Sequence, residues 1–333
     1  MVNNILIFRT DKIGDLLITC PVVLTIKKHL TNSKITLITS KNNHNYAKSF
    51  GFIDDIVMFP QGNLLEKFKF IISLSKKKYN YILILDGKDR SIISSIFISS
   101  QKKVAIMSKK RINFFWKLFN IKFIEDDEST NLIKIYQNSL KCCNINTNIS
   151  NFEYLKHKID NNFSGDFNIK KYIQIHLDEK WIKDLYIEKY KNINPSYQNF
   201  TEFLISLSKQ NNILITTGMI NFELINSLKS NFFKKKTDKI YYTKVSKNEI
   251  YLVYKPSLID LESLVRQAQV LITCHGAISH IANSFNVKMF DIIDESKKDW
   301  YSRFSSYMNN YNLIYRDSFN LIHKKIINDV LTL

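Results

Sequence analysis

The sequence predicts an α/β protein of two domains, each built around a parallel sheet. Apolar, strand-sized runs alternate with segments of helical periodicity along most of the 333 residues. Such alternation is typical of parallel sheets covered by helices on both faces. A polar stretch rich in Asn, Asp and Lys, 144–171, interrupts the pattern. Because the length also suits two domains, we expect them at 1–165 and 166–333, with the last helix packing back on the first domain.

The first half opens with a continuous apolar run at 5–8, the pattern of a buried parallel strand. A helical pattern follows from near Leu16. Beyond it, the sequence predicts strands at 35–39, 56–59, 81–85 and 103–106, and helices at 45–49, 64–76, 90–98 and 131–143.

The second half repeats this alternation after the polar stretch. It predicts strands at 173–176, 213–216, 250–253, 270–273 and 289–292. Between and after them it predicts helices at 200–210, 222–231, 258–268 and 279–284, and an amphipathic last helix at 321–333.

A charged loop lies between the first strand and the first helix. It contains Arg9, Asp11, Lys12, Gly14 and Asp15. In open α/β sheets, ligands bind at the carboxyl ends of strands, where this loop belongs. The alternative is that Asp15 only caps the helix and Gly14 only permits the turn. No G-x-G-x-x-G follows the first strand, so the dinucleotide fingerprint is absent.

Three polar strand ends in the second half are candidates for a second half-site. They are the segments 176–181, 216–218 with Glu223 shortly after, and 273–280. The last of these runs through small residues into a helix, and the N-terminus of a helix attracts anions such as a diphosphate. His275 and His280 could instead be capping or core histidines, but three converging loops favour a binding site.

The net charge of +18, from 48 Lys and Arg against 30 Asp and Glu, favours acidic partners. The alternative is a lysine-rich solvated surface. A basic and aromatic stretch could meet an anionic membrane or a phosphorylated glycolipid, or could be a surface loop before a helix with core aromatic residues. It comprises Lys102, Lys103, Lys109, Lys110, Arg111, Phe114, Phe115 and Trp116. No nucleic-acid-binding motif is present, so nucleic acid is not an expected partner.

The cysteines and acidic residues indicate no metal. Cys20, Cys142, Cys143 and Cys274 have neither a zinc spacing nor a disulfide pattern, so reduced thiols in the cytoplasm are expected. The chain has no Asp-x-Asp pair for a divalent cation, which favours metal-free chemistry. We also expect no signal peptide and no transmembrane helix.

The motif RTDKIGD at 9–15, followed by Pro21, resembles the opening of the heptosyltransferase-like enzymes of glycosyltransferase family 9. The segment YILILDGKDRS at 81–91 resembles that family's strand and loop in the first domain. The segment 258–283, ending in SHIAN, is similar to its sugar-nucleotide loop and helix. The resemblance spans most of the chain and implies a GT-B architecture, two Rossmann-like domains with parallel sheets facing a central cleft.

The resemblance also implies roles for individual residues. Asp15 matches the general base toward the acceptor hydroxyl, Lys180 a basic residue near the donor phosphates, and Glu223 an acidic residue near the donor ribose. The implied donor-binding residues are Lys180, Thr217, Gly218, Glu223, His275, Gly276, Ala277, Ser279 and His280. The implied acceptor-binding residues are Arg9, Lys12, Gly14, Asp86 and Arg90.

The implied function is inverting, metal-independent transfer of a heptose or similar sugar in lipopolysaccharide biosynthesis. The donor would be a nucleotide-diphosphate sugar such as ADP-heptose, and the acceptor a phosphorylated glycolipid or oligosaccharide, with no cofactor. The expected location is the cytoplasm, in peripheral contact with the anionic inner membrane. One departure is His275, where the family usually has Asp. It leaves the sugar open and keeps an alternative, a catalytically inactive GT-B protein that binds glycans or anionic lipid.

Overall fold

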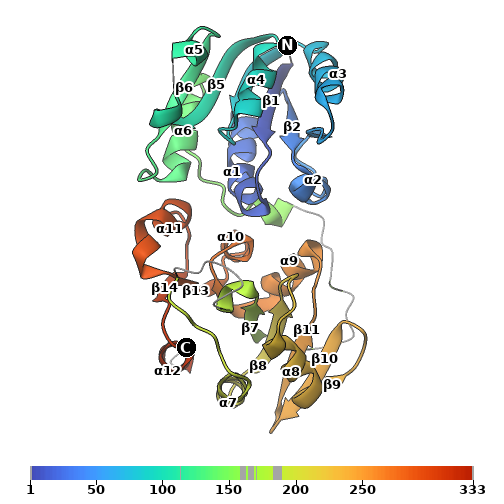
Figure 1. Ribbon diagram of the computed structural model, residues 1–333, viewed down its shortest axis with the longest axis vertical. Coiled ribbons are helices and arrows are strands. Elements are labelled where there is room, and N and C mark those ends of the chain that lie inside the picture. The colour runs from blue at the N-terminus through green and yellow to red at the C-terminus, as the bar shows by residue number, and fades with distance from the viewer. Residues whose placement is uncertain are drawn as a thin grey trace. The chain divides into compact units, whose positions relative to one another are not determined.

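The computed structural model describes residues 2–112, 114–157, 163, 169, 171–182 and 190–331 and divides into two compact units (Figure 1). Unit 1 comprises Met1–Lys158 and Asp299–Tyr307. Unit 2 comprises Ile159–Lys298 and Met308–Leu333. The last helix, α12 (Phe319–Leu331), packs on α7 (Tyr197–Ser208) inside unit 2, whereas 299–307 is the late segment that joins unit 1.

Unit 1 contains a six-stranded, all-parallel sheet in the order β3-β2-β1-β4-β5-β6. Its strands are β1 (Asn3–Arg9), β2 (Ser33–Thr39), β3 (Asp55–Met58), β4 (Tyr79–Ile84), β5 (Ser100–Ser108) and β6 (Ile121–Asp126). Its helices include α1 (Ile13–His29), α2 (Lys41–Ala47), α3 (Leu64–Ser75), α4 (Asp89–Ile96), α5 (Phe114–Lys117), α6 (Leu132–Cys142) and α11 (Lys298–Ser305), with 3-10 turns η1 (Lys109–Arg111) and η2 (Tyr154–His157).

Unit 2 contains an eight-stranded sheet in the order β14-β13-β12-β7-β8-β11-β10-β9. Its strands are β7 (Tyr172–Leu177), β8 (Asn212–Thr217), β9 (Lys234–Lys235), β10 (Ile240–Val245), β11 (Asn248–Val253), β12 (Ala268–Cys274), β13 (Lys288–Ile293) and β14 (Tyr311–Tyr315). Its other helical segments include α8 (Glu223–Asn231), α9 (Leu258–Gln267), α10 (Ala277–Ser284), η3 (Glu179–Trp181) and η5 (Glu295–Lys297).

The second sheet is mixed rather than parallel throughout, which corrects the sequence-based expectation. Strands β10 and β11 pair antiparallel, with Val245 opposite Asn248, and β9 adds to β10 in the same antiparallel sense. Only Ser246 and Lys247 join β10 to β11, and so short a connection permits only an antiparallel hairpin. Ser246 accordingly has a positive φ of 55°. The sequence also missed β6 and β14, which are edge strands.

Each sheet has one point where its strand order reverses. In unit 1 the reversal lies between β1 and β4, because β1 pairs with β2 on one side and with β4 on the other. In unit 2 it lies between β7 and β12. At such a point the loops leaving two neighbouring parallel strands turn to opposite faces of the sheet, which leaves a crevice at the carboxyl ends of the strands. We therefore expect the residues of the candidate site in the loops that follow β1, β4, β7 and β12.

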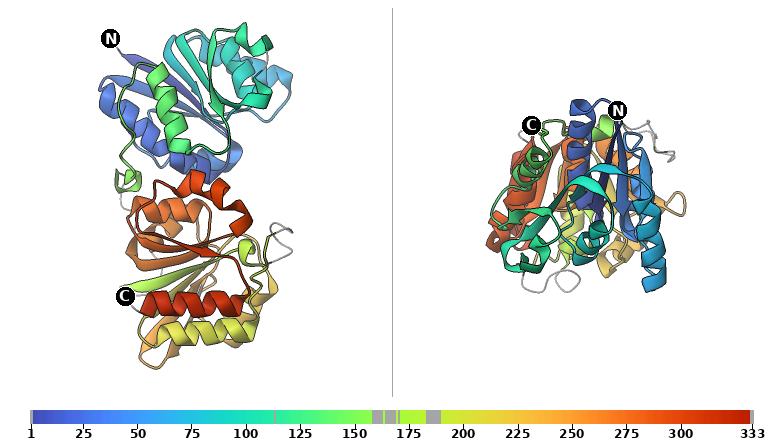
Figure 2. Two further views of the ribbon diagram at one scale, coloured as in Figure 1. Left: turned by 90° about the vertical axis from the view of Figure 1, so that its left-hand side faces the viewer. Right: turned by 90° about the horizontal axis from the view of Figure 1, so that it is seen from above.

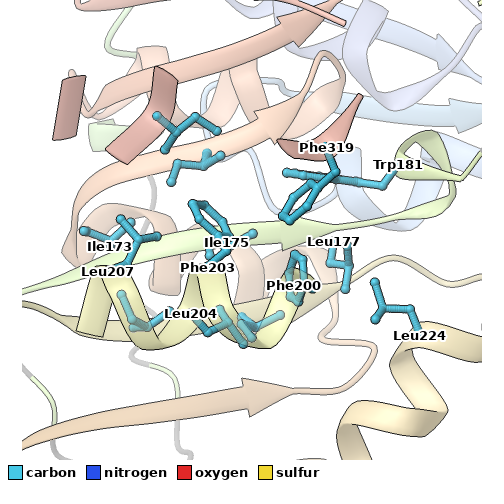
Figure 3. Packing of buried hydrophobic residues seen from close by; sticks show 14 of the residues in the cluster. Ile173, Ile175, Leu177, Trp181, Phe200, Phe203, Leu204, Leu207, Leu224 and Phe319 are labelled. Atoms are coloured by element: carbon cyan, nitrogen blue, oxygen red, sulfur yellow. The ribbon is translucent and has the colours of Figure 1, made fainter. Parts of the chain in front are cut away.

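Aromatic packing holds the carboxyl end of β7 in place in unit 2 (Figure 3). Trp181 is fully buried, 6.4 Å from Phe200 of α7 and 6.5 Å from Phe319 of α12 between ring centres. Phe319 also meets Phe203 edge to face at 5.6 Å. The indole Nε1 of Trp181 donates to the carbonyl of His176 at 2.8 Å. This cluster sets α7 beside α12 (Figure 2) and fixes the turn that follows β7.

An ion pair joins the segment 299–307 to the rest of unit 1, and both of its side chains are mostly buried. Arg303 donates from both terminal nitrogens to the two carboxylate oxygens of Asp126, at 2.5 and 2.6 Å. The ring of Tyr307 stacks on Phe152 at 4.7 Å. A bidentate pair of this kind is strongly directional, so it holds α11 at the end of β6.

Within the residues that the structure describes, no helix has both the length and the hydrophobicity needed to cross a bilayer.

Candidate functional site

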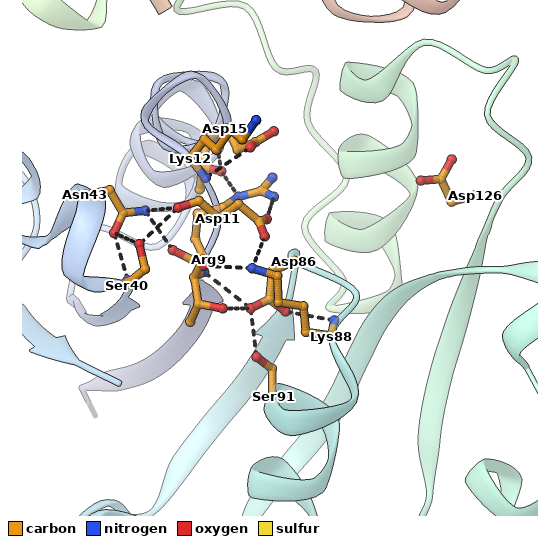
Figure 4. Close-up of polar contacts among 12 residues, drawn as sticks. Arg9, Asp11, Lys12, Asp15, Ser40, Asn43, Asp86, Lys88, Ser91 and Asp126 are labelled. Carbon is orange, nitrogen blue, oxygen red and sulfur yellow. Dashed lines mark hydrogen bonds and ion pairs between the residues drawn. The ribbon is translucent and has the colours of Figure 1, made fainter. Parts of the chain in front are cut away.

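Arg9, at the end of β1, is a buried brace for the loop that follows it (Figure 4). Its side chain is 4% exposed, with Nε donating to Thr19 Oγ1 at 2.7 Å and Nη1 to Asp11 at 2.9 Å. The guanidinium lies 5.3 Å from the centre of the Tyr136 ring. Arg9 was predicted to bind the acceptor. The contacts described for it give it a role in shaping the loop.

Asp11 joins three strand ends in unit 1. Its carboxylate is paired with Arg9 and, at 2.5 Å, with the Lys88 ammonium after β4. From the end of β2, Ser40 Oγ and Asn43 Nδ2 donate to the Asp11 carbonyl at 3.0 and 3.3 Å. These bonds from two neighbouring strands leave the 9–12 loop little freedom to move.

Asp86 connects the ends of β1 and β4. It accepts short hydrogen bonds from Thr10 Oγ1 at 2.6 Å and Ser91 Oγ at 2.7 Å, and longer ones from the Thr10 and Lys88 amides. Arg90 adds a second connection, since its Nη2 donates to Thr10 Oγ1 at 2.9 Å. The structure thus brings together three of the predicted acceptor residues, Arg9, Asp86 and Arg90, around Thr10 and Asp11.

Asp15 differs from these two carboxylates in how little it is engaged. It is the third residue of α1 and accepts one long bond, 3.3 Å, from the Lys12 amide, which is a helix-capping contact. Asp11 carries two cations and Asp86 four donors, whereas the contacts described for the Asp15 carboxylate amount to this single bond. Gly14 lies inside the first turn of α1, and Lys12 is exposed beside it. Of the three carboxylates, Asp15 best retains the lone pairs that a general base needs.

Lys180 lies at the strand-order reversal of unit 2. Its ammonium pairs with Asp178 at 2.7 Å and donates to the carbonyls of Cys274 at 3.4 Å and His275 at 3.1 Å. Arg316 holds the Lys180 backbone by donating from Nη2 to its carbonyl at 2.6 Å. A mostly buried cation therefore connects the end of β7 to the loop after β12.

Gly276 makes this position of Lys180 sterically possible. A Cβ built on Gly276 would lie 2.6 Å from the Lys180 ammonium nitrogen, closer than any real contact of that kind. The backbone there is extended, so the reason for glycine is the close approach of Lys180 and not its φ angle. Ala277, the next residue, begins α10, and the Lys180 ammonium thus lies beside the N-terminal end of that helix.

A buried hydrogen-bond network also holds the loop between β12 and α10. The Asp291 carboxylate, fully buried in β13, meets the His275 ring Nδ1 at 2.5 Å and accepts from Ser279 Oγ at 3.1 Å. Ser279 Oγ in turn accepts from the Gly276 amide at 3.3 Å. Ser279 and His280 are both buried, and burial, reinforced by the nearby His275, holds the pKa of His280 well below its usual range. These two residues support the loop from within unit 2.

The remaining predicted donor residues have structural contacts or lie at the surface. Thr217 is buried and its Oγ1 accepts from the Lys255 amide at 2.8 Å. Gly218 packs on Asp178, whose Cβ would be 2.8 Å from an added side chain. Glu223 is exposed at the start of α8. His176, near the end of β7, lies in the candidate segment 176–181 but was not a predicted donor residue. Burial lowers the pKa of His176 to about 4, which keeps its imidazole neutral near pH 7.

Sequence reasoning missed several residues that build the two half-sites. In unit 1 they are Ser40 and Asn43 after β2, and in unit 2 Asp291 and Arg316. Lys88 and Asp178 lie in the candidate segments 81–91 and 176–181, but sequence reasoning assigned a role to neither of them. Asp291 had a usable signal, since it is a charged residue inside the apolar run MFDII. A carboxylate inside a buried strand needs partners and therefore marks a polar network.

Over the described ranges, no group of three or more His, Cys, Asp or Glu side chains is placed to hold a metal ion.

Solved structures share this fold over nearly the whole chain. A glycosyl transferase family 9 protein from Veillonella parvula DSM 2008 is 13% identical, with a TM-score of 0.66 over 99% of this chain and 89% of that one. The E. coli ADP-heptose lps heptosyltransferase II is 10% identical, with a TM-score of 0.67 over 99% and 98%. The E. coli heptosyltransferase WaaC with ADP-2-deoxy-2-fluoro heptose is 13% identical, with a TM-score of 0.65 over 98% and 99%.

At such low identities the likeness establishes the fold, and it confirms the predicted GT-B type of α/β architecture. No family model and no curated protein matches the sequence.

Gly87 offers a test of the loop that holds Asp86. It has a φ of +57°, and a Cβ there would lie 2.8 Å from the Ile106 carbonyl oxygen. Gly87→Ala is therefore expected to lower the free energy of unfolding by about 1–3 kcal/mol. Gly51→Ala is the control, because Gly51 has open space around it and no positive φ. Urea unfolding of both variants would check this, and equal stabilities would contradict it.

Proposed function

We propose that this chain is a glycosyltransferase that moves a sugar from a nucleotide-diphosphate sugar to a hydroxyl of a phosphorylated glycolipid or oligosaccharide. The observation that carries the proposal is the mostly buried Lys180 ammonium, held beside Gly276 and the first turn of α10 at the strand-order reversal of unit 2. A cation and a helix N-terminus together suit a diphosphate. The fold shared with glycosyltransferases supports the same reading.

The proposed reaction is a single displacement at the anomeric carbon, which inverts its configuration. Asp15 takes the proton of the acceptor hydroxyl as its oxygen forms the new bond to that carbon. The bond from the carbon to the diphosphate oxygen breaks, and the nucleoside diphosphate leaves. The negative charge that grows on it is offset by Lys180 and the amides at the start of α10. No metal ion takes part in this scheme.

ADP-heptose is the first donor to test, because the E. coli heptosyltransferase WaaC has been solved with ADP-2-deoxy-2-fluoro heptose. His275 leaves the sugar open, since the glycosyltransferases that the sequence resembles usually have Asp there. We place the acceptor at the 9–15 loop of unit 1, where Lys12 and Arg90 are exposed cations suited to a phosphorylated sugar. A role in lipopolysaccharide biosynthesis, in the cytoplasm at the inner membrane, is part of the proposal.

His275 also favours the second candidate, an inactive GT-B protein that binds glycans or anionic lipid. Its ring is engaged with the buried Asp291, so the substitution is built into the loop. The presence of Asp15 and Lys180 at the two strand-order reversals favours the enzyme.

A donor screen tests the proposed function. Purified protein is incubated with a panel of sugar nucleotides, with excess EDTA and without it, and thermal shift and release of nucleoside diphosphate are measured. A transferase should be stabilised by one donor and should release the diphosphate at an unchanged rate in EDTA. Binding without turnover would favour the inactive protein. A rate that EDTA abolishes and magnesium restores would overturn the metal-free scheme.

Asp15→Asn should lower kcat by roughly 10²–10⁴-fold, because an amide does not accept the proton of the acceptor hydroxyl. Donor affinity and the melting temperature should change little, since Asp15 makes one long capping bond. Asp89→Asn is a matched control, an Asp in the first turn of α4 whose side chain is 58% exposed. If Asp15→Asn keeps the wild-type kcat, Asp15 is only a helix cap.

Gly276→Val should raise the donor dissociation constant at least about tenfold, or about 1.4 kcal/mol, because the new side chain displaces the Lys180 ammonium. Lys180→Met should give a similar loss without adding volume to the loop. Isothermal titration with the donor found in the screen measures both, with Gly51→Val in unit 1 as the control. Wild-type affinity in both variants would remove the diphosphate from this loop.

A further inference from the structure

Helices α3 and α4 of unit 1 expose an unusual number of large apolar side chains. Leu64 is 82% exposed, Phe68 60% and Phe97 63%. We name as the α3–α4 face the apolar residues Leu64, Leu65, Phe68, Ile72, Ile93 and Phe97, all of them exposed. Single exposed apolar residues are ordinary, but a contiguous group of them marks an interaction surface.

The face is hollowed as well as exposed. A groove of about 570 Å³ runs between the two helices, and its walls are formed by Phe59, Leu64, Leu65, Phe68, Ile71 and Ile93. Lys67 and Arg90 supply cationic groups to the same groove. The groove therefore combines mostly apolar walls with two positively charged side chains.

The surrounding charge is strongly positive. The segment 64–78, which is α3 and the turn after it, holds five lysines and one glutamate, for a net charge of +4. Lys69, Lys76 and Lys78 are exposed. A helix with protruding Leu and Phe side chains and lysines around them has the composition of helices that lie in the interface of an anionic membrane.

This charge also argues against a second copy of the chain as the occupant. A two-fold contact would bring the same surface against itself and set one lysine-rich segment against the other. The chain as a whole carries +18, so an anionic partner is favoured at long range as well.

The basic and aromatic stretch that sequence reasoning selected is less suited to a membrane. Lys102 donates to the Cys142 carbonyl, Lys103 to the Ile96 carbonyl, and Arg111 to Asp89. Trp116 is buried in the core of unit 1. Lys109 also pairs with Glu125 at 3.9 Å, so most of the stretch has internal contacts, although Phe115 and, just after the stretch, Leu118 are exposed.

We propose that the α3–α4 face docks unit 1 on the surface of an anionic lipid bilayer, with its apolar side chains in the headgroup and acyl boundary and its lysines against the lipid phosphates. The inference rests on the inner-membrane location in the proposed function and deepens it by naming the docking surface, and vesicle binding is measured apart from donor turnover, so that each can fail alone. Arg90 relates the face to the candidate site, since its guanidinium lies 5.1 Å from the centre of the Phe59 ring in the groove and donates to Thr10 in the 9–15 loop.

Vesicle co-sedimentation of the full chain tests the proposal. Wild-type protein should bind vesicles of phosphatidylcholine with phosphatidylglycerol, should bind pure phosphatidylcholine weakly, and should be released by high salt. The double variant L65E/F68E should lower the partition coefficient roughly tenfold or more, because two apolar anchors become anions. Both positions are exposed, so the fold should be kept, which circular dichroism checks.

Two control variants replace similarly exposed apolar residues elsewhere on the chain with glutamate. They are F115E/L118E, at the end of the basic and aromatic stretch of unit 1 and just after it, and L321E on α12 of unit 2. Both should bind the anionic vesicles as the wild type does. Wild-type binding by L65E/F68E, or no vesicle binding by the wild type, would overturn the proposal. So would a loss confined to F115E/L118E. A wild-type dimer that L65E/F68E separates, without vesicle binding, would overturn it in favour of a second copy.

Discussion

The reversal of strand order in a parallel sheet is the constraint on which both half-sites depend. Where β1 meets β4, and where β7 meets β12, the loops that leave the two strands turn to opposite faces of the sheet. The chain fills each opening with charged residues that hold one another. In unit 1 the Asp11 carboxylate is paired with Arg9 and Lys88. In unit 2 the Lys180 ammonium reaches across from Asp178 to the loop after β12.

Most of the polar side chains at these openings bond to other parts of the protein. These bonds hold the loops in shape, and few of the side chains point into solvent. A carboxylate in a buried strand is costly unless donors surround it, and Asp291 meets this need with His275 and Ser279. The bonds that satisfy it also fix the loop before α10, so the helix N-terminus and Lys180 keep their relative position. Lys180 takes part in this bracing through Asp178 and the carbonyls of the loop after β12, and its ammonium also lies beside the start of α10. Asp15 in unit 1 stands apart, because the contact described for its carboxylate is one long capping bond. The proposed chemistry takes its cation from Lys180 and its base from Asp15.

The sequence predicted the elements with strong periodicity and missed those whose structure depends on neighbours. Buried parallel strands such as β4 and β12 are continuous apolar runs, and they were predicted nearly to their bounds. Helix α2 begins at Lys41 and not near Asn45, because Ser40 and Asn43 form a capping pair that short periodicity does not reveal. Strands β6, β10 and β14 are half-polar, and a neighbouring strand decides that they pair.

The sequence by itself determined the α/β class, the alternation of elements and the position of the charged loops at strand ends, because these follow from local hydrophobic patterns and chain order. Only the tertiary structure decided which polar side chains brace the loops and which remain engaged by a single contact, because that depends on residues far apart in the chain. Asp86 and Thr10 are 76 positions apart, and Lys180 and His275 are 95 apart. The tertiary structure was also needed to show that the apolar α3–α4 face is exposed. Periodicity predicts that a helix has an apolar side, and only packing shows that this side remains uncovered.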